Sequence, residues 1–144
     1  MTAKRHHNAK SITLSHDIAY QTAMIDGFAL IDMPIDDLRL KKSLLDSSCG
    51  ALATFEGWVR HHNNARPVDR LTYYGYEQLA LNLGKKLVAQ ACTKFAIERA
   101  VAMHRIGDLA IGEMAVWIGV TARHRYPAFE ACRWLLDCLL YTSD

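Results

Sequence analysis

The amino-acid sequence predicts an α+β fold, a mixed or antiparallel sheet with helices packed against it. Short apolar segments typical of strands alternate with longer segments whose apolar residues recur every three or four positions, as on one helix face. The last two strand segments, 101–106 and 113–121, are joined by a glycine-containing turn at 107–112, which predicts an antiparallel hairpin. The predicted order is strand–helix–strand–strand–helix–strand–strand–helix, which favours α+β.

The chain has the length and composition of one ordinary globular domain. It has 144 residues, of which 51% are hydrophobic and 22% charged, enough for a single sizeable core. Residues 1–25 are polar and weakly patterned, with a strand expected at most at 12–14 or 18–20. We therefore assign the domain to residues 26–144. The formal net charge of +2 is too small to indicate a nucleic-acid partner.

The first part of the domain predicts a strand and then a helix. Phe28–Ile31 is a short apolar strand that must end before Pro34. Asp36 or Asp37 is suited to cap a helix that ends near Ser47.

The middle of the chain predicts two further strands. Residues 51–59 alternate between two faces, and Gly57 near the end of that segment indicates a β-bulge or a close backbone approach. Residues 71–76 are rich in tyrosine and predict another strand, whose aromatic side chains we interpret as sheet packing.

The longest helix is expected over residues 78–99. Gly84 inside it costs about 0.5–1 kcal/mol relative to alanine unless a neighbour packs against it. The predicted apolar stripe is Leu79, Leu83, Leu87, Ala91 and Phe95, widened by Val88 and Cys92.

The end of the chain joins a buried strand to a helix. Met114 to Val120 is an apolar run typical of a buried strand, and the pattern over 128–139 is helical. Pro127 lies just inside the expected helix start, where its missing N–H costs nothing.

Three observations bear on the compartment. The N-terminus lacks the apolar core of a signal peptide, and no segment approaches the roughly 20 apolar residues of a membrane span. Three of the four cysteines lie among apolar residues of predicted helices or their borders, typical of reduced core thiols. We expect a cytoplasmic protein that does not bind membranes.

Basic residues gather at three predicted strand ends. They are Arg60-His61-His62, His104-Arg105 and Arg123-His124-Arg125. Arginine suits phosphate or carboxylate, and histidine can transfer a proton near neutral pH. The third cluster precedes a helix N-terminus, whose unpaired N–H groups and positive dipole attract anions. Together the clusters indicate a pocket for a small phosphorylated molecule or a carboxylate.

Several alternatives stay open at this point. His124 and Arg125 fit an anion site or simple helix capping equally well, and His104 with Arg105 fits structural hydrogen bonding as well as substrate contact. His61 and His62 suit a solvated loop. They have no acidic or thiol partner at ligand spacing, so no metal site is expected.

The ordered motifs resemble those of the large, catalytic subunit of molybdopterin synthase. Residues 50–63 are similar to that family's GAxxxFxGxVRxHN segment, residues 104–113 to its HRIGxLxxGE segment, and residues 120–131 to its VxxxHRxxAFEA segment. The resemblance runs in order from about residue 28 to 137.

The resemblance implies an α/β hammerhead-like fold and a homodimer that assembles with two small subunits into a heterotetramer. The partner would be a small ubiquitin-like sulfur-carrier subunit whose C-terminal thiocarboxylate donates sulfur, so that no cofactor is needed. The substrate would be cyclic pyranopterin monophosphate, converted to molybdopterin. By family position, Arg60, His124 and Arg125 would be catalytic, and Trp58 and Val59 would join them in binding substrate.

This sequence departs from the family pattern in three places. Trp58 is bulkier than the residue expected there, and Arg123 replaces a small one. The family's lysine at the position of Leu140, and a second lysine further on, are missing, from which we expect a truncated chain that transfers sulfur poorly. The alternative is a non-catalytic subunit that binds pterin phosphate and the sulfur carrier. A weaker hypothesis is an unrelated phosphate- or RNA-binding domain, which the small net charge disfavours.

Overall fold

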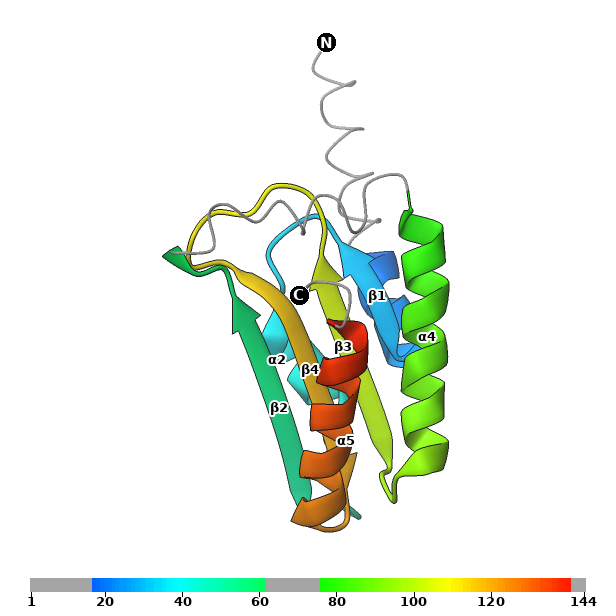
Figure 1. Cartoon of the computed structure of the whole chain (residues 1–144). Coiled ribbons are helices and arrows are strands. Elements are labelled where there is room, and N and C mark those ends of the chain that lie inside the picture. Colours follow the sequence, from blue (N-terminus) through cyan, green and yellow to red (C-terminus); the bar gives the residue numbers. More distant parts are fainter. Residues whose placement is uncertain (1–16, 62–75, 141–144) are drawn as a thin grey trace.

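The fold is seen in a computed structural model that describes residues 17–61 and 76–140 (Figure 1). A helix over residues 17–26 precedes the named elements. These are β1 (Phe28–Ile31), α2 (Asp37–Ser43), β2 (Ala51–Trp58), α4 (Glu77–Lys94), β3 (Arg99–Arg105), β4 (Met114–Ala122) and α5 (Arg125–Leu139).

The four strands form one mixed sheet in the order β1-β3-β4-β2. β1 runs parallel to β3, and β4 runs antiparallel to both β3 and β2. The predicted α+β class is therefore confirmed, as are the strand at Phe28–Ile31 and the hairpin of the last two strands. The β2–β4 register shifts between Gly57 and Trp58, which confirms the bulge expected at Gly57.

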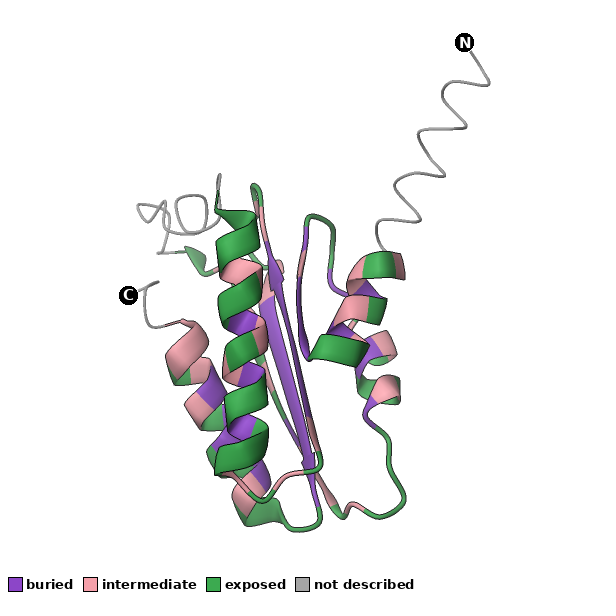
Figure 2. Ribbon diagram, turned by 90° about the vertical axis from the view of Figure 1, so that its right-hand side faces the viewer, coloured by how far each residue is buried: buried purple, intermediate pink, exposed green. Residues whose placement is uncertain are grey.

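Helices cover both faces of the sheet (Figure 2). Alternate residues of a strand point to opposite faces, so a strand in the middle of a three-layer domain must be apolar on both sides. β3 shows this clearly: Ala100 and Ala102 face α4 and α5, whereas Val101 and Met103 face the helix over 17–26 and α2.

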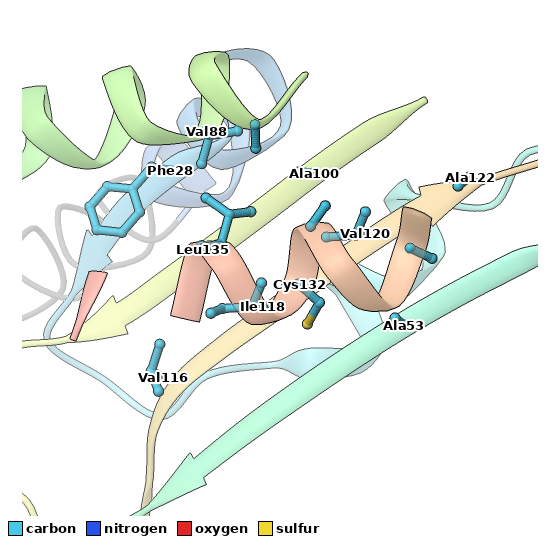
Figure 3. Close-up of a cluster of buried hydrophobic side chains, with 14 residues drawn as sticks. Phe28, Ala53, Val88, Ala100, Val116, Ile118, Val120, Ala122, Cys132 and Leu135 are labelled. Atoms are coloured by element: carbon cyan, nitrogen blue, oxygen red, sulfur yellow. The ribbon is translucent and has the colours of Figure 1, made fainter. Parts of the chain in front are cut away.

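The larger core lies between the sheet and the pair α4 and α5 (Figure 3). α5 buries one face, made of Ala128, Ala131, Cys132 and Leu135. From the sheet, this core takes Phe28, Ala53, Ala100, Ala102, Val116, Ile118, Val120 and Ala122.

The buried face of α4 differs from the predicted stripe. Leu79 and Leu83 are 66% and 53% exposed, so their assignment to the core was wrong. The face that packs on the sheet contains Val88 and Ala91, as predicted, together with Gly84. The reason is steric: a Cβ at position 84 would overlap the ring of Phe28, so α4 approaches β1 through its smallest residue.

Replacing Gly84 by alanine is expected to destabilise the protein although alanine favours helix. The gain in helix propensity is about 1 kcal/mol, whereas overpacking against Phe28 costs about 1–3 kcal/mol and forces the ring to move. We expect a net loss of unfolding free energy, measured by urea denaturation. Gln90→Ala, at an exposed position of α4, is the control and should change it by less than about 0.5 kcal/mol. Unchanged stability of Gly84→Ala would contradict the close packing.

The second core lies on the opposite face of the sheet and includes residues before position 26, where the predicted domain begins. Residues 17–26 are helical, so the strand considered at 18–20 is wrong; the one considered at 12–14 lies outside the described residues. Tyr20 and Ala23 of this helix are buried against Val101, Met103 and Trp117 of the sheet. These apolar contacts give the weakly patterned segment its helical structure.

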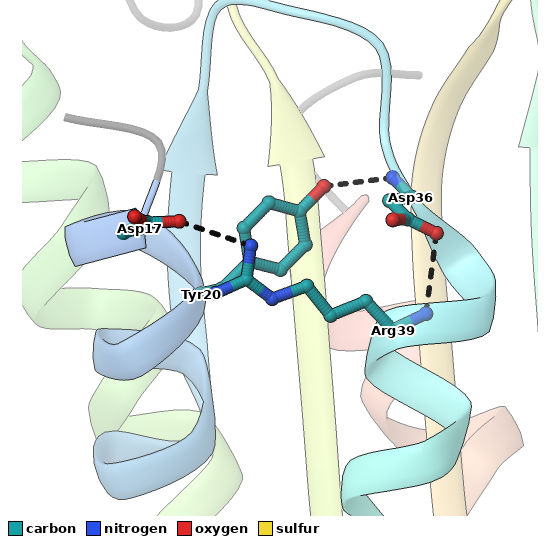
Figure 4. Close-up of polar contacts among 4 residues, drawn as sticks. All are labelled: Asp17, Tyr20, Asp36 and Arg39. Carbon is teal, nitrogen blue, oxygen red and sulfur yellow. Dashed lines mark hydrogen bonds and ion pairs between the residues drawn. The ribbon is translucent and has the colours of Figure 1, made fainter. Parts of the chain in front are cut away.

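Tyr20 also joins this helix to the start of α2 (Figure 4). The Asp36 N–H donates a hydrogen bond to the Tyr20 hydroxyl at 2.7 Å. Asp36 caps α2 by accepting from the Arg39 N–H, and the Arg39 guanidinium lies 4.4 Å from the centre of the Tyr20 ring. Burial raises the pKa of Tyr20 above its ordinary value, so the hydroxyl stays protonated.

Tyr20→Phe is expected to lower the unfolding free energy by about 1 kcal/mol. The ring and its stacking on Arg39 are kept, and the Asp36 N–H loses its acceptor. Thermal denaturation measures the change. Tyr126→Phe is the matched control because Tyr126 is 71% exposed, and it should leave the melting temperature unchanged. Equal effects of the two variants would show that the hydrogen bond contributes nothing.

Several element boundaries differ from those predicted. α2 ends at Ser43 rather than near Ser47, and α4 ends at Lys94 because Phe95 is extended and Arg99 already pairs with Thr121 in the sheet. α5 begins at Arg125, three residues before the predicted 128. The strand predicted over 71–76 lies outside the described residues except for Tyr76, which is the N-cap residue of α4.

Candidate functional site

The first group of predicted site residues lies at the carboxyl end of β2. Trp58 is 63% exposed, and its Nε1 donates to Glu56 Oε1 at 3.1 Å. The bulge at Gly57 turns the strand here, and a Cβ at Gly57 would lie only 2.7 Å from Val116 Cγ1. Arg60, the next residue but one after Trp58, is exposed. The indole of Trp58 and the guanidinium of Arg60 are therefore both at the surface, two positions apart in the chain.

Val59 is held between Trp58 and Arg60 by two backbone hydrogen bonds. Its N–H donates to the Glu113 carbonyl at 2.9 Å, and its carbonyl accepts from the Gly112 N–H at 2.8 Å. Gly112 has a φ of +90°, a conformation that strongly favours glycine. The turn between β3 and β4 thus fixes the backbone at the carboxyl end of β2.

The second group lies at the N-terminus of α5. Arg123, His124 and Arg125 are all exposed. His124 occupies the N-cap position, yet its side chain makes no capping hydrogen bond, which argues against the capping alternative. The first turn contains no acidic residue, so the positive end of the helix dipole is not neutralised within the helix. This end of the molecule suits an anion.

The single chain does not bring these two groups together. Ala51 pairs with Ala122 at one end of the β2–β4 ladder, and Trp58 pairs with Met114 at the other. Arg60 and His124 lie beyond opposite ends of this ladder, which is itself about 23 Å long at roughly 3.3 Å per residue. Figure 1 shows the end of β2 and the start of α5 at opposite ends of the sheet. The single pocket predicted from all three clusters is wrong for one chain.

The remaining predicted cluster, His104 and Arg105, is buried at the end of β3. His104 and Arg105 are 3% and 6% exposed. His104 Nδ1 lies 2.8 Å from the Arg105 carbonyl oxygen, and Arg105 pairs with Glu113 at 2.5 Å. Of the two alternatives, the structure favours structural hydrogen bonding. Sequence reasoning missed Glu113, whose position across the hairpin turn from Arg105 was the available signal.

The remaining reactive side chains that the structure describes are not gathered into a metal site. No group of three or more His, Cys, Asp or Glu residues in the described ranges is placed to hold a metal ion. Cys132 is buried, which raises the pKa of its thiol to about 11, whereas Cys92 is exposed and was wrongly assigned to the core. His61 is exposed, and His62 lies outside the described residues, as do Tyr73 and Tyr74.

Within 17–61 and 76–140, no helix combines the length and apolarity that crossing a bilayer requires.

Fold and site together define an α+β domain with exposed arginine and histidine groups at both ends of one antiparallel strand pair. The chain belongs to the MoaE protein family, whose model matches residues 30–140. A relative from Pyrococcus abyssi, named molybdopterin synthase catalytic subunit, is 35% identical over 112 residues, 76% of this chain and 75% of its own length. One of the same name from Thermoplasma volcanium is 35% identical over 117 residues, 81% of this chain and 85% of its own.

Solved structures have the same fold. Molybdopterin synthase from Staphylococcus aureus superposes with a TM-score of 0.65 at 22% identity, over 76% of this chain and 80% of that one. A complex of subunits 1 and 2 of the molybdopterin-converting factor from Helicobacter pylori gives a TM-score of 0.58 at 20% identity, over 76% of this chain and 75% of that one. The predicted family and its fold are confirmed.

Proposed function

We propose that this protein is the catalytic subunit of molybdopterin synthase, a sulfurtransferase of molybdenum cofactor biosynthesis. It takes sulfur from the C-terminal thiocarboxylate of a small ubiquitin-like carrier subunit and places it on cyclic pyranopterin monophosphate. The support is membership of the MoaE family, together with relatives of at least 35% identity that are named catalytic subunits. Those names favour the enzyme over the non-catalytic alternative.

The observation that carries the proposal is the pair of exposed basic groups at the two ends of the β2–β4 ladder. Arg60 stands at one end, and His124 and Arg125 stand at the N-terminus of α5. The substrate carries a phosphate, and guanidinium groups and helix N-termini bind phosphate well. Since one chain holds these groups beyond opposite ends of a ladder about 23 Å long, we infer that each site combines Arg60 of one protomer with His124 and Arg125 of its partner.

A homodimer with twofold symmetry satisfies this requirement, because an isologous interface creates two identical sites. β2 is an edge strand of the sheet, and its Thr54, Glu56 and Trp58 are exposed. These features support an interface near the carboxyl end of β2. Two carrier subunits on the dimer give the heterotetramer. The cytoplasmic location stays a prediction from the sequence.

In this site each group has a chemical task. Arg60 and Arg125 hold the phosphate and offset negative charge that develops during sulfur transfer, a term that is often large in catalysis. The imidazole of His124 is suited to donate or accept a proton in this reaction. Trp58 and Val59 border the substrate. Sulfur arrives covalently on the carrier, so the proposed reaction uses no resident cofactor or metal.

The direct test mixes the protein with thiocarboxylated carrier and precursor and measures the dithiolene product. We expect product only when the carrier is thiocarboxylated, with the carboxylate form of the carrier as control. If the protein and its Leu140→Lys variant both bind carrier and precursor but form no product, the non-catalytic alternative is supported.

A single substitution tests the expectation that the missing family lysine at position 140 slows sulfur transfer. Leu140 is partly buried against the α4–α5 core, and Leu140→Lys is expected to increase the rate of sulfur transfer. An unchanged rate would show that this position does not limit the reaction.

A further inference from the structure

We propose that Arg105 and Glu113 are positioning residues that hold Val59 in place and, through it, orient the Arg60 side chain toward the substrate. The proposal rests on the proposed function, in which Arg60 contacts the substrate. It concerns two residues that lie outside the exposed basic groups and that are joined to Arg60 only through the backbone.

The first step is the anchoring of the β3–β4 turn. Arg105 is the last residue of β3, is 6% exposed, and its Nη1 donates to Glu113 Oε2 at 2.5 Å. The other carboxylate oxygen of Glu113 accepts from the Ala110 N–H at 2.8 Å. One carboxylate therefore ties the turn to a buried arginine at the end of a central strand. The Ile106 N–H donates to the Ile31 carbonyl at 2.9 Å, which holds that strand end in the sheet.

The second step is the link from Glu113 to the substrate end of β2. While its side chain binds Arg105, the Glu113 carbonyl accepts from the Val59 N–H at 2.9 Å, and the Gly112 N–H donates to the Val59 carbonyl at 2.8 Å. The regular β2–β4 register has shifted between Gly57 and Trp58, just before this point. These two hydrogen bonds therefore set the direction in which the chain leaves the bulge, and Arg60 is the next residue.

The third step is electrostatic. The pKa of Glu113 lies below its ordinary value, first because the Ala110 N–H donates to it and then because Arg105 does. The carboxylate is thus ionised at neutral pH, and both of its hydrogen bonds are kept. Arg105 Nε is buried and has no hydrogen-bond partner among the described residues. An ion pair that is buried only on its arginine side and leaves one arginine donor unpaired is a poor source of net stability, so its main contribution here is a defined geometry.

The test compares Glu113→Ala with Asp108→Ala, an exposed carboxylate of the same turn. We expect Glu113→Ala to raise the KM for the pterin precursor and to lower kcat, with kcat/KM about tenfold lower, because a misdirected Arg60 binds the phosphate less tightly and offsets the developing charge less well. Asp108→Ala should leave both constants unchanged. Hydrogen exchange at the Val59 amide, measured by NMR, should become faster in Glu113→Ala and stay unchanged in Asp108→Ala. Glu113→Gln, which keeps an acceptor for Ala110, should fall between wild type and alanine, and it replaces Glu113→Ala if that variant does not fold.

A double-mutant cycle separates the two proposals. If Glu113 acts through Arg60, the KM of Arg60→Ala/Glu113→Ala equals that of Arg60→Ala alone. Multiplicative effects, or unchanged Val59 exchange and KM in both Glu113 variants, would overturn the positioning role while leaving Arg60 in the site. A normal KM and kcat for Arg60→Ala would instead refute the role of Arg60 in the proposed function, and the Val59 exchange rate would still report whether the turn is anchored by Glu113.

Discussion

Arg60→Ala and Arg125→Ala are each expected to lower the rate of dithiolene formation by about 10²–10³-fold, the range seen when one charge-stabilising donor is removed. A mixture of the two variants, exchanged into mixed dimers, is expected to recover about a quarter of the wild-type activity. Random exchange makes about half of the dimers mixed, and each mixed dimer has one site with both substitutions and one site with neither. The recovery follows only if Arg60 and Arg125 of one site come from different protomers.

The measurement is the rate of product formation before and after subunit exchange, at constant total protein. Arg133→Ala is the control variant because Arg133 lies on the same helix as Arg125 with its side chain 85% exposed and only a distant ion pair to Asp137. It should keep full activity alone and in mixtures. Failure of the mixture to recover, with mixed dimers demonstrated by mass spectrometry, would refute the composite site.

Trp117→Ala is expected to lower the unfolding free energy by about 3–5 kcal/mol. Trp117 is 1% exposed and packs in the core between the sheet and the helices over 17–26 and 37–43. Truncation leaves a cavity in that core, which also contains Leu44 and Met103. Urea denaturation followed by far-UV circular dichroism measures the change, since the loss of the ring alters fluorescence.

Trp58→Ala provides a matched comparison because it removes the same side chain from an exposed position. Trp58 is 63% exposed, so its loss should change the unfolding free energy by less than about 0.5 kcal/mol. Its expected effect is on precursor binding instead. Comparable destabilisation by both substitutions would contradict the assignment of Trp117 to the core and Trp58 to the surface.

Local pattern was sufficient for the strands and for the exposed site residues. The alternation in 51–58 predicted β2, Gly57 marked its bulge, and the glycine-containing turn predicted the β3–β4 hairpin. These features depend on neighbouring residues, which is why the sequence reveals them. Arg60, His124 and Arg125 were found for the same reason, since each follows a recognisable strand; their roles in the site stay predictions.

Helix faces were less predictable. The leucines of α4 suggested a stripe through Leu79 and Leu83, but the face that packs is the one containing Gly84, because Phe28 of β1 needs that space. Similarly, Tyr20 gains its helical setting from the sheet and from Asp36, sixteen positions further along the chain. Partners so distant in sequence leave no periodic signal at the residue itself.

By itself, the sequence determined the α+β class, the family resemblance and the chemical character of the site residues. Only the tertiary structure decided how those residues are grouped. Arg60 and His124 follow strands that run antiparallel to each other, so the register of β2 with β4 places them at opposite ends of the sheet. The same register brings Glu113 against Val59 and pairs its side chain with Arg105. Strand register depends on long-range pairing, so only the sheet separates Arg123–Arg125 from Arg60, and this separation is the basis of the proposed two-protomer site.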